Sequence, residues 1–261
     1  MVDFSFRYQE FEVLLLFIVR MGGFVFTAPF FSRTEVPNQF KIGLTVFLAY
    51  LTYYATMPHQ ALVYAGVIEY AILVIRELIV GIIVGWAASI CVSIVFFAGR
   101  IVDMDIGFSM VNAIDPSTRE NATISGFYYQ YTVMLILLIS GMHRYVIEAI
   151  VETYSLIPLT GAVFNLQKMY DSLLFYLAEY VNIGFRICMP VFAVILIVNV
   201  VLGILAKVAP QMNMFAVGMQ IKVLAGLGVM TLTTAMLPYV SDFIYTQTKV
   251  MVVSMVEAMM P

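Results

Sequence analysis

The stretch LIVGIIVGWAASICVSIVFFAG (78–99) contains no Asp, Glu, Lys or Arg. Crossing the roughly 30 Å hydrocarbon core of a bilayer takes about 20 apolar residues in a helix, so this stretch is long enough to span a membrane. Three further runs are equally free of charge: 121–142, 187–206 and 223–240. Because such runs are too long for barrel strands and lack strict alternation, we predict an all-α, polytopic membrane protein.

Three weaker runs complete the apolar pattern. Residues 42–58 are slightly short, residues 11–31 contain Glu12 and Arg20, and residues 61–75 contain Glu69. Residues 162–186 have the pattern of an amphipathic helix. Breaks rich in Pro, Gly, Asn or Ser are expected at 27–39, 57–60, 112–121, 155–161 and 208–213. No separate soluble domain and no repeat is evident, so we expect one membrane-embedded subunit over residues 1–261.

The composition supports the membrane assignment and excludes several other classes. The chain is 62% hydrophobic and 11% charged, with a mean hydropathy of +0.98, whereas soluble domains are about half apolar and about a quarter charged. The net charge is −3 and the 13 basic residues are scattered, so nucleic acid is not an expected partner. Cys91 and Cys188 lie in apolar runs and are interpreted as packing residues. The mixed charges before residue 13 do not fit a cleaved signal peptide.

The sequence offers no grouping of residues for catalysis or for a metal. His59 and His143 are isolated, and no nucleotide-binding, metalloprotease or nucleophile-elbow motif occurs. Asp103 and Asp105 are two residues apart and would point away from each other on a helix. We therefore expect neither an enzyme nor a cofactor.

Ionisable residues in apolar surroundings are the unusual feature of this chain. A charge at membrane depth costs about 2.5 to 3.5 kcal/mol or more, so each one needs a partner or a role. Arg20 and Glu69 are predicted to be buried ionisable residues, and Lys207 is similarly placed. Four others lie at the ends of apolar runs and are interpreted as helix-end residues that reach the interface: Arg76, Glu77, Arg100 and Arg186.

Two irregular segments interrupt the apolar runs. In LAKVAPQMNMF (205–215), the proline should end or kink a helix, which gathers Lys207, Pro210, Gln211 and Asn213 at one place. These residues predict polar contacts between subunits, and the alternative is a short loop at the interface. Residues 98–126 combine glycines and polar residues with apolar ones, which is compatible either with a loop tucked into protein or with a plain loop.

These two segments resemble the FliR family, the R subunits of the flagellar type III export gate. The resemblance is carried by GRIVDMDIGFSMVNAIDP (99–116) and LGILAKVAPQMNMFAVGMQIKVLAGL (202–227), including an A-P-Q-x-N motif. Weaker support comes from RMGGFVFTAPFFSRTEVPNQFKIGL (20–44) and EYAILVIRELIVGIIVGW (69–86). The similarity extends over nearly the whole chain in order and spacing.

The resemblance implies a subunit in the bacterial inner membrane, within the flagellar basal body. Its implied partners are the P-type and Q-type subunits FliP and FliQ, an FlhB-type subunit at the cytoplasmic mouth, and unfolded export substrates. Tilted, kinked helical hairpins would form a channel with these partners. A loop at about 106–122 would plug that channel through the residues Ile106, Gly107, Phe108, Met110, Asn112 and Ile114.

Two alternatives remain open at the level of sequence. One is an export-gate subunit of an injectisome, which the same motifs would fit. The other is an ion-coupled secondary transporter that uses Glu69, Arg20 or Lys207, although transporters usually show internal repeats and this chain shows none.

Overall fold

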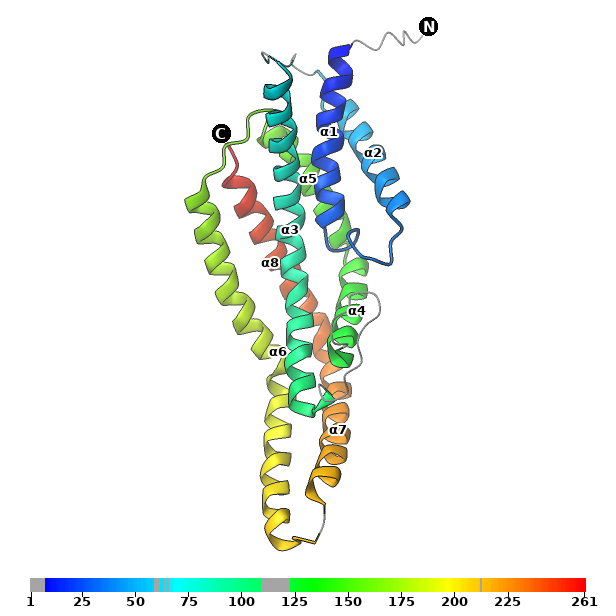
Figure 1. The fold of residues 1–261 in the computed structure, drawn as a ribbon, viewed down its shortest axis with the longest axis vertical. Coiled ribbons are helices and arrows are strands. Elements are labelled where there is room, and N and C mark those ends of the chain that lie inside the picture. The colour runs from blue at the N-terminus through cyan, green and yellow to red at the C-terminus, as the bar shows by residue number, and fades with distance from the viewer. Residues whose placement is uncertain (1–7, 59–61, 63, 65, 109–122, 212) are drawn as a thin grey trace. The chain divides into compact units, whose positions relative to one another are not determined.

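The structure is a computed structural model that describes residues 8–58, 62, 64, 66–108, 123–211 and 213–261. Within these ranges the chain is helical and contains no strand, which confirms the predicted all-α class (Figure 1). The helices are α1 (Tyr8–Thr27), α2 (Asn38–Ala55), α3 (Val67–Ile106), α4 (Ile124–Ile139), α5 (Met142–Leu156), α6 (Leu166–Val208), α7 (Met214–Thr233) and α8 (Leu237–Glu257), with a 3₁₀ turn η2 (Thr234–Met236) between the last two.

Proline and glycine set several of the helix ends, and the sequence predicts the two at the prolines. Pro37 directly precedes α2, and α6 ends at Val208, two residues before Pro210. Proline has no backbone N–H and disfavours helical backbone in the residue before it, which explains why α6 stops there. Gly107 follows α3 with a φ of +98°, a left-handed conformation that ends a helix most easily at glycine.

Two helices are longer than the sequence indicates. α3 has 40 residues and joins the run 61–75 to the run 78–99, while α6 has 43 and joins the amphipathic segment to the run 187–206. The interpretation of Arg76, Glu77, Arg100 and Arg186 as helix-end residues is therefore wrong, because all four lie inside a helix. Arg and Glu are good helix formers, so one or two charges between apolar runs do not interrupt a helix.

Three helical stretches of the described chain are long and apolar enough to cross a membrane: α3, α6 and the stretch Phe215–Glu257. α4 and α5 would add a fourth only if the two are taken as one bent span. At a rise of about 1.5 Å per residue, α3 and α6 are each roughly 60 Å long, about twice the thickness of the hydrocarbon core. Each of them therefore extends beyond the hydrocarbon.

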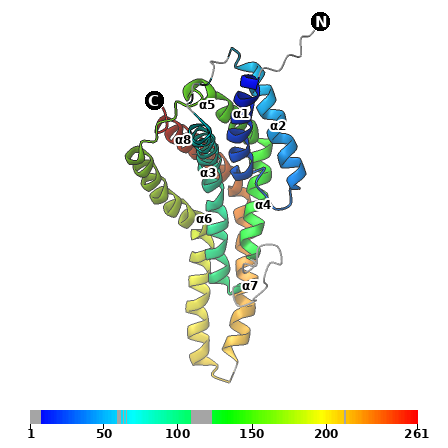
Figure 2. The same cartoon turned by 45° about the horizontal axis from the view of Figure 1, so that its top comes forward.

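The chain forms two compact units, and α1, α2, α5 and parts of α3, α6 and α8 belong to the first. α1 and α2 run antiparallel beside each other (Figures 1 and 2). A β-carbon added to Gly81 of α3 would lie 2.0 Å from the carbonyl oxygen of Arg20 on α1. Only glycine allows the two helix backbones to approach this closely, as at small-residue contacts between membrane helices.

The second unit contains residues 91–140 and 175–246, with α4, α7 and the remaining parts of α3, α6 and α8. The C-terminal part of α6 and α7 form an antiparallel hairpin around residues 209–213 (Figures 1 and 2). Large apolar side chains along this hairpin are exposed: Ile197, Val200, Ile204, Val208, Phe215 and Leu224. An apolar surface of this kind marks contact with lipid or with another protein.

Candidate functional site

Arg20 and Glu77 form a buried ion pair in the first unit. Both side chains have 0% exposure, and Arg20 Nε donates to Glu77 Oε2 at 2.5 Å. The terminal nitrogens of Arg20 donate to the carbonyl oxygens of Thr153 and Ile157, each at 3.2 Å. The second carboxylate oxygen of Glu77 accepts from the backbone N–H of Thr160 at 3.2 Å. Each charge thus has its counter-charge and further hydrogen bonds, which is what makes a buried pair tolerable.

The position of Arg20 follows from the end of α5. Thr153 and Ile157 lie in the last turn of α5 and just beyond it, where the helix dipole is negative. The Thr153 carbonyl also accepts the backbone N–H of Ile157 at 2.8 Å, so Arg20 is its second donor. The guanidinium carbon of Arg20 also lies 4.4 Å from the ring centroid of Tyr154, which stacks on Phe17 of α1 at 4.3 Å. We call Arg20, Glu77, Thr153, Tyr154 and Ile157 the Arg20 cluster. It joins α1, α3 and the end of α5.

The structure places the two ionisable residues that the sequence expects to be buried in different surroundings. Arg20 is buried, but Glu69 is exposed in the first turn of α3. The carboxylate buried against Arg20 is that of Glu77, two helical turns further along α3. Sequence reasoning assigned Glu77 to a helix end and so missed the pair. No local signal separates the two, because Glu69 and Glu77 are both acidic residues in apolar stretches of the same helix.

The second candidate site is the junction between α3 and α4. The carboxylate of Asp103, one turn before the end of α3, accepts the backbone N–H of Ser125 at 3.1 and 3.3 Å. Ser125 lies in the first turn of α4, whose N–H groups need acceptors. Gly99 and Gly126 also meet, since a β-carbon on Gly99 would lie 2.3 Å from the α-carbon of Gly126. The chain therefore leaves α3 and enters α4 at adjacent points.

Hydrogen bonds extend the junction to α7. The Ser125 hydroxyl donates to the sulfur of Met230 at 3.3 Å, and the hydroxyls of Tyr129 and Thr233 lie 3.3 Å apart. Ile106, the last residue of α3, is fully buried and packs over Gly226 of α7. The ends of α3 and α4 are therefore held on α7.

A cavity of about 230 Å³ lies beside the end of α3. Ile106 and Gly107 line it, together with Asn199 of α6 and Lys222 of α7. Lys222 is near enough to the carboxylate of Asp105 for electrostatic attraction. One carboxylate oxygen of Asp105 is buried and has no hydrogen-bond partner among the described residues. The cavity thus places Asn199 of α6 and Lys222 of α7 beside the point where the predicted plug begins.

The structure describes only the start of the predicted plug. Ile106 is buried, whereas Gly107 and Phe108 are partly exposed. The other predicted plug residues, Met110, Asn112 and Ile114, lie outside the described residues. The plug therefore stays a prediction, and its described base is the α3–α4 junction.

The break at 207–213 is the turn of the α6–α7 hairpin. Lys207 is in the last turn of α6, and Asn213 caps α7 by accepting the backbone N–H of Ala216 at 3.4 Å. Lys207, Pro210, Gln211 and Asn213 are all exposed. The predicted helix stop is confirmed, and the predicted contacts of these residues with other subunits stay a prediction.

Comparison with known proteins gives one family for nearly the whole chain. The model of the family described as bacterial export proteins, family 1, matches residues 11–248. This range includes the Arg20 cluster, the α3–α4 junction and the hairpin turn.

Three relatives illustrate the similarity. The flagellar biosynthetic protein FliR of Bacillus subtilis (strain 168) is 29% identical over 217 residues, which cover 82% of each chain. The FliR protein of Escherichia coli (strain K12) is 23% identical over 87% of this chain and 84% of its own. The surface presentation of antigens protein SpaR of Shigella flexneri is 24% identical over 85% of this chain and 86% of its own.

Proposed function

This chain belongs to the bacterial export proteins, family 1, and on that basis we propose that it is a subunit of the flagellar type III protein export gate. In this proposal it lies in the inner membrane and, with P-type and Q-type subunits, forms the channel for unfolded flagellar proteins. An FlhB-type subunit would contact the cytoplasmic mouth of that channel. The observation that carries the proposal is the family match over residues 11–248. The flagellar relatives add support, because their alignments cover more than four fifths of the chain.

The exposed surface of the α6–α7 hairpin supports a role inside an assembly. The hairpin exposes apolar side chains on both helices and places Lys207, Gln211 and Asn213 at its turn. Lipid would suit the apolar side chains but would leave the polar groups of the turn without partners if the turn lay in the hydrocarbon. Neighbouring subunits can satisfy both kinds of surface, because hydrogen bonds between membrane helices are each worth about 0.6 to 2 kcal/mol.

The α3–α4 junction supports the proposal that residues 106–122 plug the channel. A plug needs a fixed base, and the junction holds both ends of this segment through Asp103, Ser125 and the Gly99–Gly126 contact. Ile106 and Phe108 supply apolar side chains at that base, and a dry apolar constriction blocks water and ions.

The injectisome alternative draws on the similarity to SpaR, whose identity of 24% lies within the range of the flagellar relatives. Expression of the chain in a flagellated strain that lacks its own R subunit separates the two functions. A flagellar subunit should restore swimming and should co-purify with the P-type and Q-type subunits. Absence of both in cells that make normal amounts of the chain would refute the flagellar assignment.

The variants Lys207→Leu and Asn213→Leu test the hairpin turn in the same strain. Each keeps the apolar character that lipid would accept but removes a polar group, so we expect less co-purified P-type and Q-type subunit. The control is Lys168→Leu, because Lys168 is also exposed but lies in the first turn of α6 in the other compact unit. Normal assembly and swimming of both turn variants would show that the turn makes no subunit contact.

A further inference from the structure

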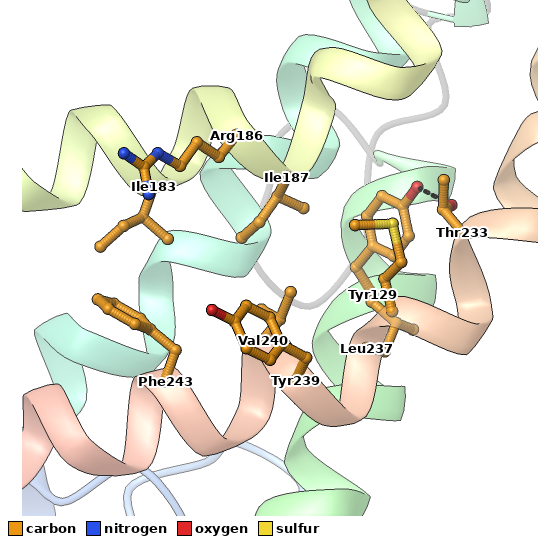
Figure 3. A pocket seen from close by; sticks show the side chains of 10 residues that line it. Tyr129, Ile183, Arg186, Ile187, Thr233, Leu237, Tyr239, Val240 and Phe243 are labelled. Carbon is orange, nitrogen blue, oxygen red and sulfur yellow. Dashed lines mark hydrogen bonds between the residues drawn. The ribbon is translucent and has the colours of Figure 1, made fainter.

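An apolar groove of about 180 Å³ lies between α6 and α8 in the second unit (Figure 3). Ile183 and Ile187 of α6 face Val240 and Phe243 of α8 across it, and Tyr129 of α4 lies at one end. At one end the groove shares Tyr129 and Thr233 with the hydrogen bonds that hold α4 on α7, and none of the roles discussed above uses its apolar walls.

The groove lies where both of its helices pass from an apolar run to polar sequence. On α6 the uncharged run begins at residue 187, immediately after Arg186. On α8 the uncharged stretch ends at Ser241, directly before Asp242. The end with Tyr129 and Leu237 is therefore at hydrocarbon depth, whereas the end with Phe243 and Ile183 is near the interface.

The interfacial end of the groove contains a positively charged side chain. Arg186 lines the groove, and Figure 3 shows its side chain extending along α6 toward Ile183, away from Tyr129. Its guanidinium has no ion pair or hydrogen bond within the described part of the chain. Tyr239, which is 77% exposed, also lines the groove and directs its hydroxyl toward this end. Asp242 is not among the lining residues.

We propose that this groove binds one phospholipid, with the phosphate on Arg186 and an acyl chain between α6 and α8. A guanidinium is the preferred side chain for a phosphate, because it donates two parallel hydrogen bonds. The apolar walls that continue from Arg186 toward Tyr129 match a lipid tail that descends from a headgroup at the interface. A soluble solute would meet too few polar groups in this groove, and a folded partner domain would not enter it.

The proposal requires only that α6 and α8 cross a membrane, so it stands whether or not the chain is a gate subunit. Its first test is native mass spectrometry of the full chain, extracted from the membrane with its partners and then washed with increasing detergent. We expect one phospholipid to remain bound after the bulk lipid is removed. Arg186→Gln should lower its retention about tenfold or more, the effect of losing a charge-assisted hydrogen bond.

Arg144→Gln is the matched control for this charge. Arg144 is also exposed but lies on α5 in the first unit, so its loss changes the net charge equally and leaves the groove intact. Ile187→Trp fills the groove without a change of charge and should also lower retention. Equal retention by wild type, Arg186→Gln and Ile187→Trp would overturn the proposal.

A photo-crosslinking amino acid at Val240 tests what occupies the groove in cells that assemble the complete export apparatus. A crosslinked product heavier by the mass of one phospholipid supports the proposal. Crosslinking to another protein at this position would overturn it, because the groove would then be a subunit contact. The crosslink should disappear when Ile187→Trp is added.

Discussion

Removal of the Glu77 charge should strongly destabilise the chain, since Arg20 would then stay buried without its counter-charge. Glu77→Leu deletes the acceptor of the 2.5 Å bond from Arg20 and the acceptor of the Thr160 N–H. Breaking one side of a buried ion pair costs about 3 to 5 kcal/mol. For a chain of this length that corresponds to roughly 6 to 20 °C in melting temperature.

The double variant Arg20→Met, Glu77→Leu separates the charge effect from the hydrogen-bond effect. It removes both charges but leaves the carbonyl oxygen of Ile157 without its Arg20 donors and the Thr160 N–H without its carboxylate acceptor, whereas the Thr153 carbonyl keeps the N–H of Ile157. Each buried group left unsatisfied costs about 1 to 3 kcal/mol, so the double variant should remain less stable than wild type. It should nevertheless be more stable than the sum of the two single variants predicts, by about 1 to 3 kcal/mol of coupling.

The assay is thermal unfolding of the detergent-solubilised chain with its co-purified partners. The fraction of protein that stays monodisperse is measured as the temperature rises. Arg144→Met serves as the control, because Arg144 is an exposed arginine of α5 outside the Arg20 cluster. If Glu77→Leu and Arg20→Met each shift the melting temperature no more than this control does, the Arg20 cluster does not hold α1, α3 and α5 together.

Three further outcomes follow from close contacts in the two units. Gly81→Ala should lower the free energy of unfolding by about 1 to 3 kcal/mol, since the added β-carbon would lie 2.0 Å from a backbone oxygen. Gly228→Ala is its control in the same melting assay and should be neutral or stabilising, because no atom lies within 4 Å of the added β-carbon. Asp103→Ala should lower the free energy of unfolding by about 1 kcal/mol, because the Ser125 N–H at the start of α4 loses its acceptor. Asp103→Asn should lower it less, because the amide oxygen can still accept. Equal melting temperatures of wild type and both variants would show that Asp103 does not cap α4. Replacing residues 109–122 by a short linker should leave the complex assembled, because the ends of α3 and α4 are adjacent, but should raise membrane conductance; an intact complex without a leak would refute the plug.

The sequence alone determined the class of the protein and most of its helices. Hydropathy is a local property, so uncharged runs such as 78–99 and 187–206 identify membrane helices without any knowledge of their neighbours. The helix stop before Pro210 is also local, because it depends on the backbone restrictions of a single residue. The two quoted motifs, 99–116 and 202–227, were sufficient to indicate the family that the comparison confirms.

Only the tertiary structure decided which charges are buried and what they contact. Glu69 and Glu77 lie in the same helix within similar apolar sequence, yet one is exposed and the other is buried against Arg20. The difference depends on which face of α3 meets α1, and the close contact at Gly81 fixes that face. The pairing of Asp103 with Ser125 likewise depends on α4 returning to the end of α3. A partner distant in sequence becomes a neighbour only through helix packing, which no local pattern of residues encodes.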